Sequence, residues 1–138
     1  MIADTSALLA ILNREPDAER YETEILTAVP CRMSVADILE TTIVVESRGG
    51  AEAGHELDAY LEHAAIEPIS VAREHLAAAR LAWRHFGKGR HQAALNSGDC
   101  FAYVLADVTG EPLLFTTGDD FARTGIQAVP APSREPSW

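Results

Sequence analysis

The sequence predicts an α/β protein: a three-layer α/β/α domain with a short central parallel sheet. Short apolar runs of strand character alternate with segments of helical periodicity, and Gly, Pro or capping residues separate them. This alternation is typical of a parallel sheet covered by helices on both faces. The chain has 138 residues, the size of one domain. We expect that domain to occupy residues 1–130 and a polar C-terminal tail to occupy residues 131–138.

In the first half of the chain, apolar runs of strand type precede segments with helical spacing. Ser34 followed by Asp37 three residues later is the sequence pattern of a capping box and predicts a helix start. Gly49 and Gly50 end that helix. The predicted elements are a strand at 1–3, helices at 6–15 and 17–28, a strand at 29–34 and a helix at 35–48.

The second half continues the alternation and adds a Gly-rich polar loop at 86–99. Ser97 is the expected N-cap of the helix after this loop, and Gly110 ends that helix. The remaining predicted elements are helices at 52–65 and 71–85 and strands at 66–70, 112–117 and 125–132.

The composition is that of an ordinary globular protein, with 47% apolar and 23% charged residues. No apolar run approaches the roughly 20 residues of a membrane-spanning helix, and no signal-peptide pattern is visible. The two cysteines, Cys31 and Cys100, lack the spacing of a metal-binding pair. We therefore expect buried, reduced thiols in a cytoplasmic protein.

The net charge of −10, from 21 acidic and 11 basic residues, should repel nucleic acid over most of the surface. The basic residues are unevenly spread, however, because five of them fall in "REHLAAARLAWRHFGKGR", residues 73–90. Such a run is more often a solvated helix face. The alternative is a local strip that contacts phosphates, formed by Arg73, Arg80, Arg84, Lys88 and Arg90.

Several carboxylates stand where a parallel sheet would bring them together. Asp4 follows the first strand, and Asp119 and Asp120 follow the strand "PLLFTT", so these acids fall at the same sheet edge. Asp99 lies in the first turn of its helix, where an acid also interacts favourably with the helix dipole. The stretch Asp4-Thr5-Ser6 could equally be ordinary helix capping.

Glu40 is the best single candidate for a functional acid. Its neighbours on one helix face are Ala36, Ile43 and Val44, and a carboxylate in an apolar stripe is seldom buried without a partner or a metal. Asp37, by contrast, is explained by its position in the capping box.

If Asp4, Glu40, Asp99 and Asp119 converge, their repulsion and desolvation call for a divalent cation. An all-oxygen ligand set suits Mg²⁺ or Mn²⁺ rather than zinc. Thr5 and Ser6 would support the ligands or contact a substrate phosphate. Phosphodiester hydrolysis is the chemistry that such a site performs.

Four motifs, in order along nearly the whole chain, resemble those of PIN-domain ribonucleases and, more narrowly, of VapC-type toxins of bacterial VapBC toxin–antitoxin pairs. They are "IADTSALLAIL", "MSVADILET", "FGKGRHQAALNSGDCFAYVLA" and "LLFTTGDDFARTGI". The third of them is the most specific. The resemblance implies an Mg²⁺- or Mn²⁺-dependent endoribonuclease that cleaves RNA and arrests translation and growth. It also implies a homodimer and inhibition by a cognate VapB-type antitoxin.

By motif, Asp4, Glu40 and Asp99 match the firmest acidic positions of that family. The fourth acid belongs to "GDDF"; Asp119 is preferred because it directly follows Gly118, with Asp120 as second choice. Ser6 and Thr117 match small polar positions of the same pocket. The loop residues Lys88, Arg90 and His91 become candidates for substrate-phosphate contact.

Two other functions remain open on the residues alone. A non-catalytic acidic module could receive the arginines of a basic partner peptide. A metal-dependent phosphatase of the haloacid-dehalogenase type also uses an Asp after its first strand, but it needs a second Asp where this chain has Ser6.

Overall fold

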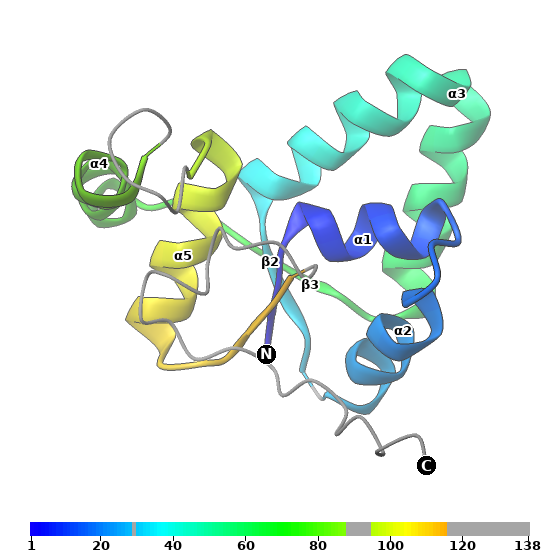
Figure 1. Ribbon diagram of the computed structural model, residues 1–138, viewed down its shortest axis with the longest axis horizontal. Helices are drawn as coiled ribbons and strands as arrows, with labels where there is room; N and C mark the ends of the chain where they lie inside the picture. The colour runs from blue at the N-terminus through cyan, green and yellow to red at the C-terminus, as the bar shows by residue number, and fades with distance from the viewer. Residues whose placement is uncertain (29, 88–94, 116–138) are drawn as a thin grey trace, which may run out of the picture.

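The structure is a computed structural model that describes residues 1–28, 30–87 and 95–115. The described part of the chain forms four short strands and five helices (Figure 1). In chain order these are β1 (Ile2–Ala3), α1 (Thr5–Leu12), α2 (Ala18–Thr27), β2 (Arg32–Ser34), α3 (Val35–His63), β3 (Glu67–Ile69), α4 (Arg73–Phe86), α5 (Ser97–Thr109) and β4 (Leu113–Leu114).

The strands form one parallel sheet in the order β3-β2-β1-β4. Ile2 is opposite Arg32 of β2 on one side and opposite Leu113 of β4 on the other. The predicted class, an α/β fold with a short central parallel sheet, is confirmed. Because the strands are parallel, the loops that leave their carboxyl ends meet at a single edge.

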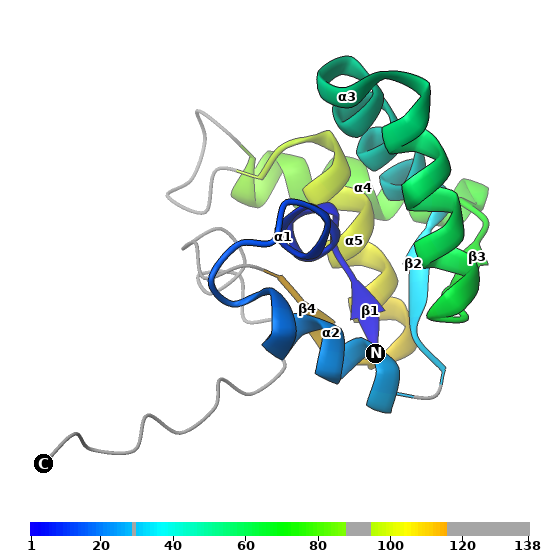
Figure 2. The same cartoon turned by 90° about the vertical axis from the view of Figure 1, so that its right-hand side faces the viewer.

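Helices cover both faces of the sheet. Figures 1 and 2 show α4 and α5 on one side and α1, α2 and α3 on the other. The strand residues alternate between these layers, as the two-residue period of a strand requires. Ile2 and Leu113 pack with α4 and α5, whereas Ala3 and Leu114 pack with α1 and α3. Each face therefore has its own apolar core.

The helix α3 is bent at Gly50, whose φ of 68° and ψ of −162° lie outside the helical region. The positive φ favours glycine, because a Cβ there would clash with the backbone. The two helices predicted at 35–48 and 52–65 are thus the two limbs of one kinked helix (Figure 1). The kink folds the second limb back beside α1 and α2.

One predicted helix cap is wrong, and the other is confirmed without its capping box. Ser97 does not cap α5; Asn96 does, and it forms a capping box with Asp99. Ser34 is the N-cap of α3, as predicted, and its hydroxyl accepts from the Ala36 N–H, but Asp37 does not complete a capping box.

The remaining predicted elements fall partly beyond the described ranges. The strand expected at 125–132, the end of the strand at 112–117 and most of the Gly-rich loop lie outside the described residues. Both cysteines, Cys31 and Cys100, are buried free thiols, as expected. Within the described ranges, no helix combines the length and apolar character needed to cross a bilayer.

Candidate active site

Asp4 occupies the first turn after β1 and is 2% exposed. Its backbone N–H donates to the Leu114 carbonyl of β4 at 3.0 Å, which fixes the residue at the carboxyl edge of the sheet. Its Oδ2 accepts from the Ser6 N–H at 3.0 Å and caps α1. Asp4 is therefore both the N-cap of α1 and an acid at the carboxyl end of β1.

Asp37, in the first turn of α3, is fully buried beside this strand end. Its carbonyl accepts hydrogen bonds from the Thr5 hydroxyl at 3.2 Å, which joins α1 to α3, and from the Thr41 hydroxyl of the same helix at 2.8 Å. Both of its carboxyl oxygens are buried, and neither has a hydrogen-bond partner among the described residues. A buried carboxylate without donors is costly, so the fold keeps Asp37 here against its own stability.

Glu40 lies one turn beyond Asp37 and is partly exposed. Glu40 was expected to lie in a buried apolar stripe. That expectation is wrong, because the apolar residues near Glu40 do not face the core: Ile43 is 56% exposed. The buried face of this limb is instead the line Asp37, Thr41 and Val45. Glu40 stands at the border between the buried line and the exposed apolar one.

The N-terminus of α5 packs directly against these acids. A Cβ built on Gly98 would overlap Oε2 of Glu40, would lie 2.7 Å from its Cδ, and would lie 2.9 Å from Oδ1 of Asp37. Glycine at this position lets the start of α5 lie directly against the two carboxylates of α3. Neither carboxylate forms an ion pair with a described cation.

Asp99 is the fourth acid at this edge and is 9% exposed. Its Oδ2 accepts from the Asn96 N–H at 3.0 Å, and its own N–H donates to the Asn96 side chain at 2.9 Å. The capping box holds the carboxyl group in one orientation at the start of α5.

The pKa values show that the charges of these acids interact. Burial, and after it the charges of Asp4, Glu40 and Asp99, together raise the pKa of Asp37 to about 10. Burial also raises the pKa of Glu40, with a contribution from Asp4. The structure thus brings Asp4, Glu40 and Asp99 together around Asp37, and we call these four residues the acid cluster.

Sequence reasoning missed Asp37 as a member of this group because the capping pattern seemed to explain it. A signal was present, since Asp37 and Glu40 are three residues apart and share a helix face. Thr5 and Ser6 lie beside the cluster, where Thr5 is buried and bonded to Asp37. The other predicted site residues lie outside the described residues: Lys88, Arg90, His91, Thr117, Asp119 and Asp120.

The acid cluster has the chemistry of a site for a hard divalent cation. Its donors are all carboxylate oxygens, which Mg²⁺ and Mn²⁺ prefer, and the bare oxygens of Asp37 need a positive partner. Within the described ranges, no three His, Cys, Asp or Glu side chains are already arranged as a metal-binding group. Carboxylates that repel one another are expected to stand further apart without a cation than with one.

Comparison with known proteins identifies the family. The model of the family described as "PIN domain" matches residues 1–127. The chain belongs to the PIN-domain family. Within it, the chain is 49% identical over 132 residues to ribonuclease VapC30 of Mycobacterium tuberculosis, covering 96% of this chain and 100% of that protein. It is 51% identical over 129 residues to ribonuclease VapC of Mycolicibacterium smegmatis, covering 94% and 99% of the two chains. These identities place it with the VapC proteins.

Solved structures agree with the PIN fold. A toxin–antitoxin complex from Klebsiella pneumoniae contains a chain with a TM-score of 0.69 at 14% identity, covering 94% of this chain and 97% of that one. The M. tuberculosis toxin VapC20, described as cleaving the sarcin–ricin loop, also has a TM-score of 0.69 at 19% identity, covering 93% and 97%. At such identities the likeness concerns the fold alone.

Proposed function

We propose that this VapC-family protein is a divalent-metal-dependent endoribonuclease toxin, whose cleavage of RNA inhibits translation and growth. The observation that carries this function is the acid cluster at the carboxyl edge of the sheet, centred on a buried carboxylate without hydrogen-bond donors from the described residues. The names of the VapC relatives, which are ribonucleases, support the same activity.

The acid cluster would hold the cation, Mg²⁺ or alternatively Mn²⁺, with Asp119 or Asp120 as the predicted further ligand. A bound divalent cation lowers the pKa of water and offsets charge that develops on the phosphodiester. The protein supplies the positioning: the Ser6 N–H orients Asp4, the Thr5 hydroxyl holds the backbone of Asp37, and Asn96 orients Asp99.

The surroundings of the cluster also favour a phosphate. The helices α1, α3 and α5 all begin at this edge, and helix N-termini attract anions. Arg80 of α4 lines a hollow together with Ser97, and Ser97 also lines the hollow that contains Glu40. We therefore favour the phosphate-contact interpretation of this basic segment, with Lys88, Arg90 and His91 as further predicted contacts.

We further propose a homodimer in the cytoplasm that a cognate VapB-type antitoxin neutralises. Exposed apolar side chains support a protein partner, because a contiguous apolar surface marks such interfaces. Leu39 and Ile43 on α3 are 60% and 56% exposed, and Leu76 and Trp83 on α4 are 51% and 41% exposed. Leu39 and Ile43 line the hollow that contains Glu40, and Leu76 and Trp83 line a second hollow that shares Ser97 and Phe101 with it.

Cleavage of a labelled RNA by the purified protein tests the function. The wild type should cleave in Mg²⁺ or Mn²⁺ and stop in a chelator. The substitutions Asp4→Asn, Glu40→Gln and Asp99→Asn should each lower the rate by about 10²-fold or more. Glu46→Gln is the matched control, since Glu46 is an exposed glutamate on the same helix.

Two results would contradict this function. Cleavage that persists in all three acid variants, prepared free of other nucleases, would show that the acid cluster is not the active centre. A wild type that binds divalent cations and basic peptides but leaves every RNA intact would instead indicate the non-catalytic acidic module.

A further inference from the structure

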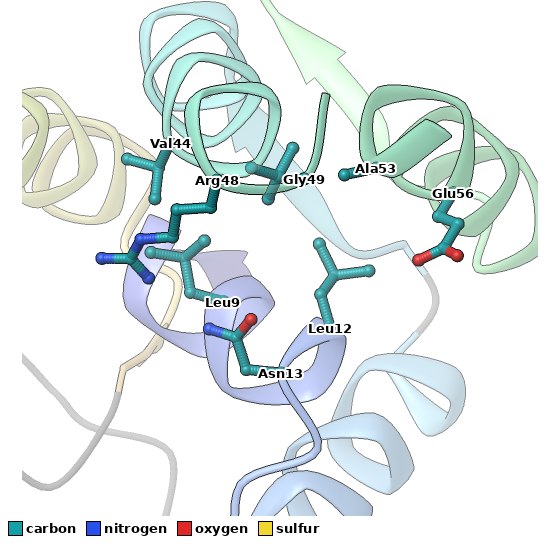
Figure 3. A pocket seen from close by; sticks show the side chains of 9 residues that line it. Leu9, Leu12, Asn13, Val44, Arg48, Gly49, Ala53 and Glu56 are labelled. Carbon is teal, nitrogen blue, oxygen red and sulfur yellow. The ribbon is translucent and has the colours of Figure 1, made fainter. Parts of the chain in front are cut away.

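A pocket lies between α1 and the kink of α3, away from the acid cluster (Figure 3). It encloses about 180 Å³ and has an apolar floor that includes Leu9, Val44 and Ala53. Its rim is polar. Figure 3 shows the Arg48 guanidinium reaching over the pocket toward Leu9 and Asn13 of α1, while the Glu56 carboxylate stands at the opposite end.

This pocket is connected to the acid cluster along one line of α3. Glu40, Val44 and Arg48 occupy successive turns of the same helix face, so the first and last are separated by roughly 12 Å along the axis. Val44 lines both this pocket and the hollow that contains Glu40. The hollow at Glu40 lies between α3 and α5 and the pocket lies between α1 and α3, so a strand bound at the acid cluster would pass over Val44 to reach the pocket at Arg48.

The chemistry of the pocket suits one nucleotide. Arg48 is exposed and forms no ion pair with a described residue, so its planar guanidinium is available for a phosphate or for the face of a base. The apolar floor can receive the flat surface of a base, and the Asn13 amide and Glu56 carboxylate offer a donor and acceptors for its edge. The volume is below the 300–1,000 Å³ typical of drug-sized ligands, as expected for a single base.

We propose that this pocket is a nucleotide subsite for the RNA strand beside the cleaved bond, where Arg48 contacts the backbone and the floor holds one base. This subsite rests on the ribonuclease function proposed above. Arg48, at an apolar pocket two turns along α3 from Glu40, matches a polyanion with apolar bases better than it matches a basic peptide, which Arg48 would repel.

Two pairs of variants test the subsite. Arg48→Ala removes the guanidinium, and its control Arg14→Ala removes an exposed arginine just after α1 that does not line the pocket. Ala53→Phe fills the pocket, and its control Ala51→Phe adds the same ring at an exposed position two residues away. Thermal melting verifies that each variant is folded, and Asn13→Ala at the rim replaces Ala53→Phe if the ring prevents folding.

The readouts are steady-state cleavage of RNA, mapping of the cleaved ends, and binding of a fluorescent single-stranded hexaribonucleotide of random sequence in Ca²⁺. Arg48→Ala should raise KM about tenfold with little change in kcat. It should also reduce the slope of log K against log salt by about 1, the signature of one lost phosphate contact. Ala53→Phe should alter the base preferred at one position next to the cut. Both controls should behave as the wild type does.

Each outcome separates the subsite from the catalytic function. Wild-type cleavage with unchanged KM, salt slope and base preference in Arg48→Ala and Ala53→Phe overturns the subsite alone and leaves the pocket to a protein segment. A wild type that binds the hexaribonucleotide through Arg48 without cleaving it supports the subsite and overturns the nuclease. A wild type that neither binds nor cleaves RNA overturns both.

Discussion

The two edges of the sheet carry carboxylates in opposite electrostatic surroundings. At the amino edge, Glu111 accepts from the Met1 ammonium at 2.7 Å and from Arg32 at 2.9 Å. Partial burial would raise the pKa of Glu111, but these two cations lower it below its ordinary value. At the carboxyl edge, the pKa values of Asp37 and Glu40 are raised.

The difference separates structural acids from functional ones. Glu111 joins the starts of β1 and β2, and its charge stabilises the fold. Asp37 is buried among three other acids, so the folded protein must hold either a proton or a cation at this group, and taking up the proton costs stability. Acids that cost stability where they stand are expected at functional sites, and the following predictions test this contrast.

Replacing one acid at each edge with its amide should have opposite effects on the stability of the protein. Asp37→Asn should lower RNA cleavage by about 10²-fold while raising the melting temperature of the metal-free protein, because the variant no longer has to protonate a buried acid as it folds. Glu111→Gln should leave cleavage within about twofold and cost about 0.5–1 kcal/mol of stability, as expected for a partly exposed ion pair. Cleavage assays and thermal unfolding of the two variants, side by side, measure both effects. Equal loss of activity in both variants would remove the distinction between the edges.

Divalent cations should stabilise the protein through the carboxyl edge. At a concentration 100 times its dissociation constant, a cation that binds only the folded state adds about 2.7 kcal/mol, which is a rise of roughly 10 °C in melting temperature. Mg²⁺ or Mn²⁺ should give this rise in the wild type and in Glu111→Gln, but not in Asp37→Asn. A rise of the same size in Asp37→Asn would place the cation elsewhere.

Gly98→Ala should damage the site with little effect on the fold. The new methyl group would occupy the space of the Glu40 carboxyl, and displacement of that group should slow cleavage about tenfold. Alanine is otherwise the better helix former, so unfolding should change by less than about 1 kcal/mol. Ser97→Ala, an exposed neighbour, is the control for this measurement. Wild-type cleavage by Gly98→Ala would mean that the position of Glu40 matters little.

The metal-free protein should lose stability as the pH rises. The folded-state pKa of Asp37 is about 10, well above its ordinary value of 3.8, so the folded protein binds more protons than the unfolded chain between these values. The contribution of this group is therefore largest below about pH 4 and declines toward pH 10. Glu40 acts in the same direction, whereas Glu111, with its lowered pKa, loses its contribution in acid.

Thermal unfolding in a chelator between pH 5 and 9 measures this slope, and Asp37→Asn should flatten it. A slope that is identical in the wild type and in Asp37→Asn would show that Asp37 is not protonated in the folded protein.

The sequence by itself determined the fold class and much of the site. Alternating apolar runs and helical periods predicted the parallel sheet. The prediction succeeded because even strands of two or three residues consist of the apolar residues that a buried sheet needs. An acid directly after a strand, as at Asp4, or at the start of a helix, as at Asp99, has a position that the local pattern fixes.

Only the tertiary structure decided which acids meet and which acids are paired. Asp37 and Glu111 look alike in sequence as carboxylates near element ends, but the arginine and ammonium that neutralise Glu111 come from distant parts of the chain. The exposed side of α3 also follows from packing, because the apolar line through Ile43 carries the sequence signature of a core face. Burial and charge pairing depend on neighbours far apart in the chain, and no local pattern encodes them.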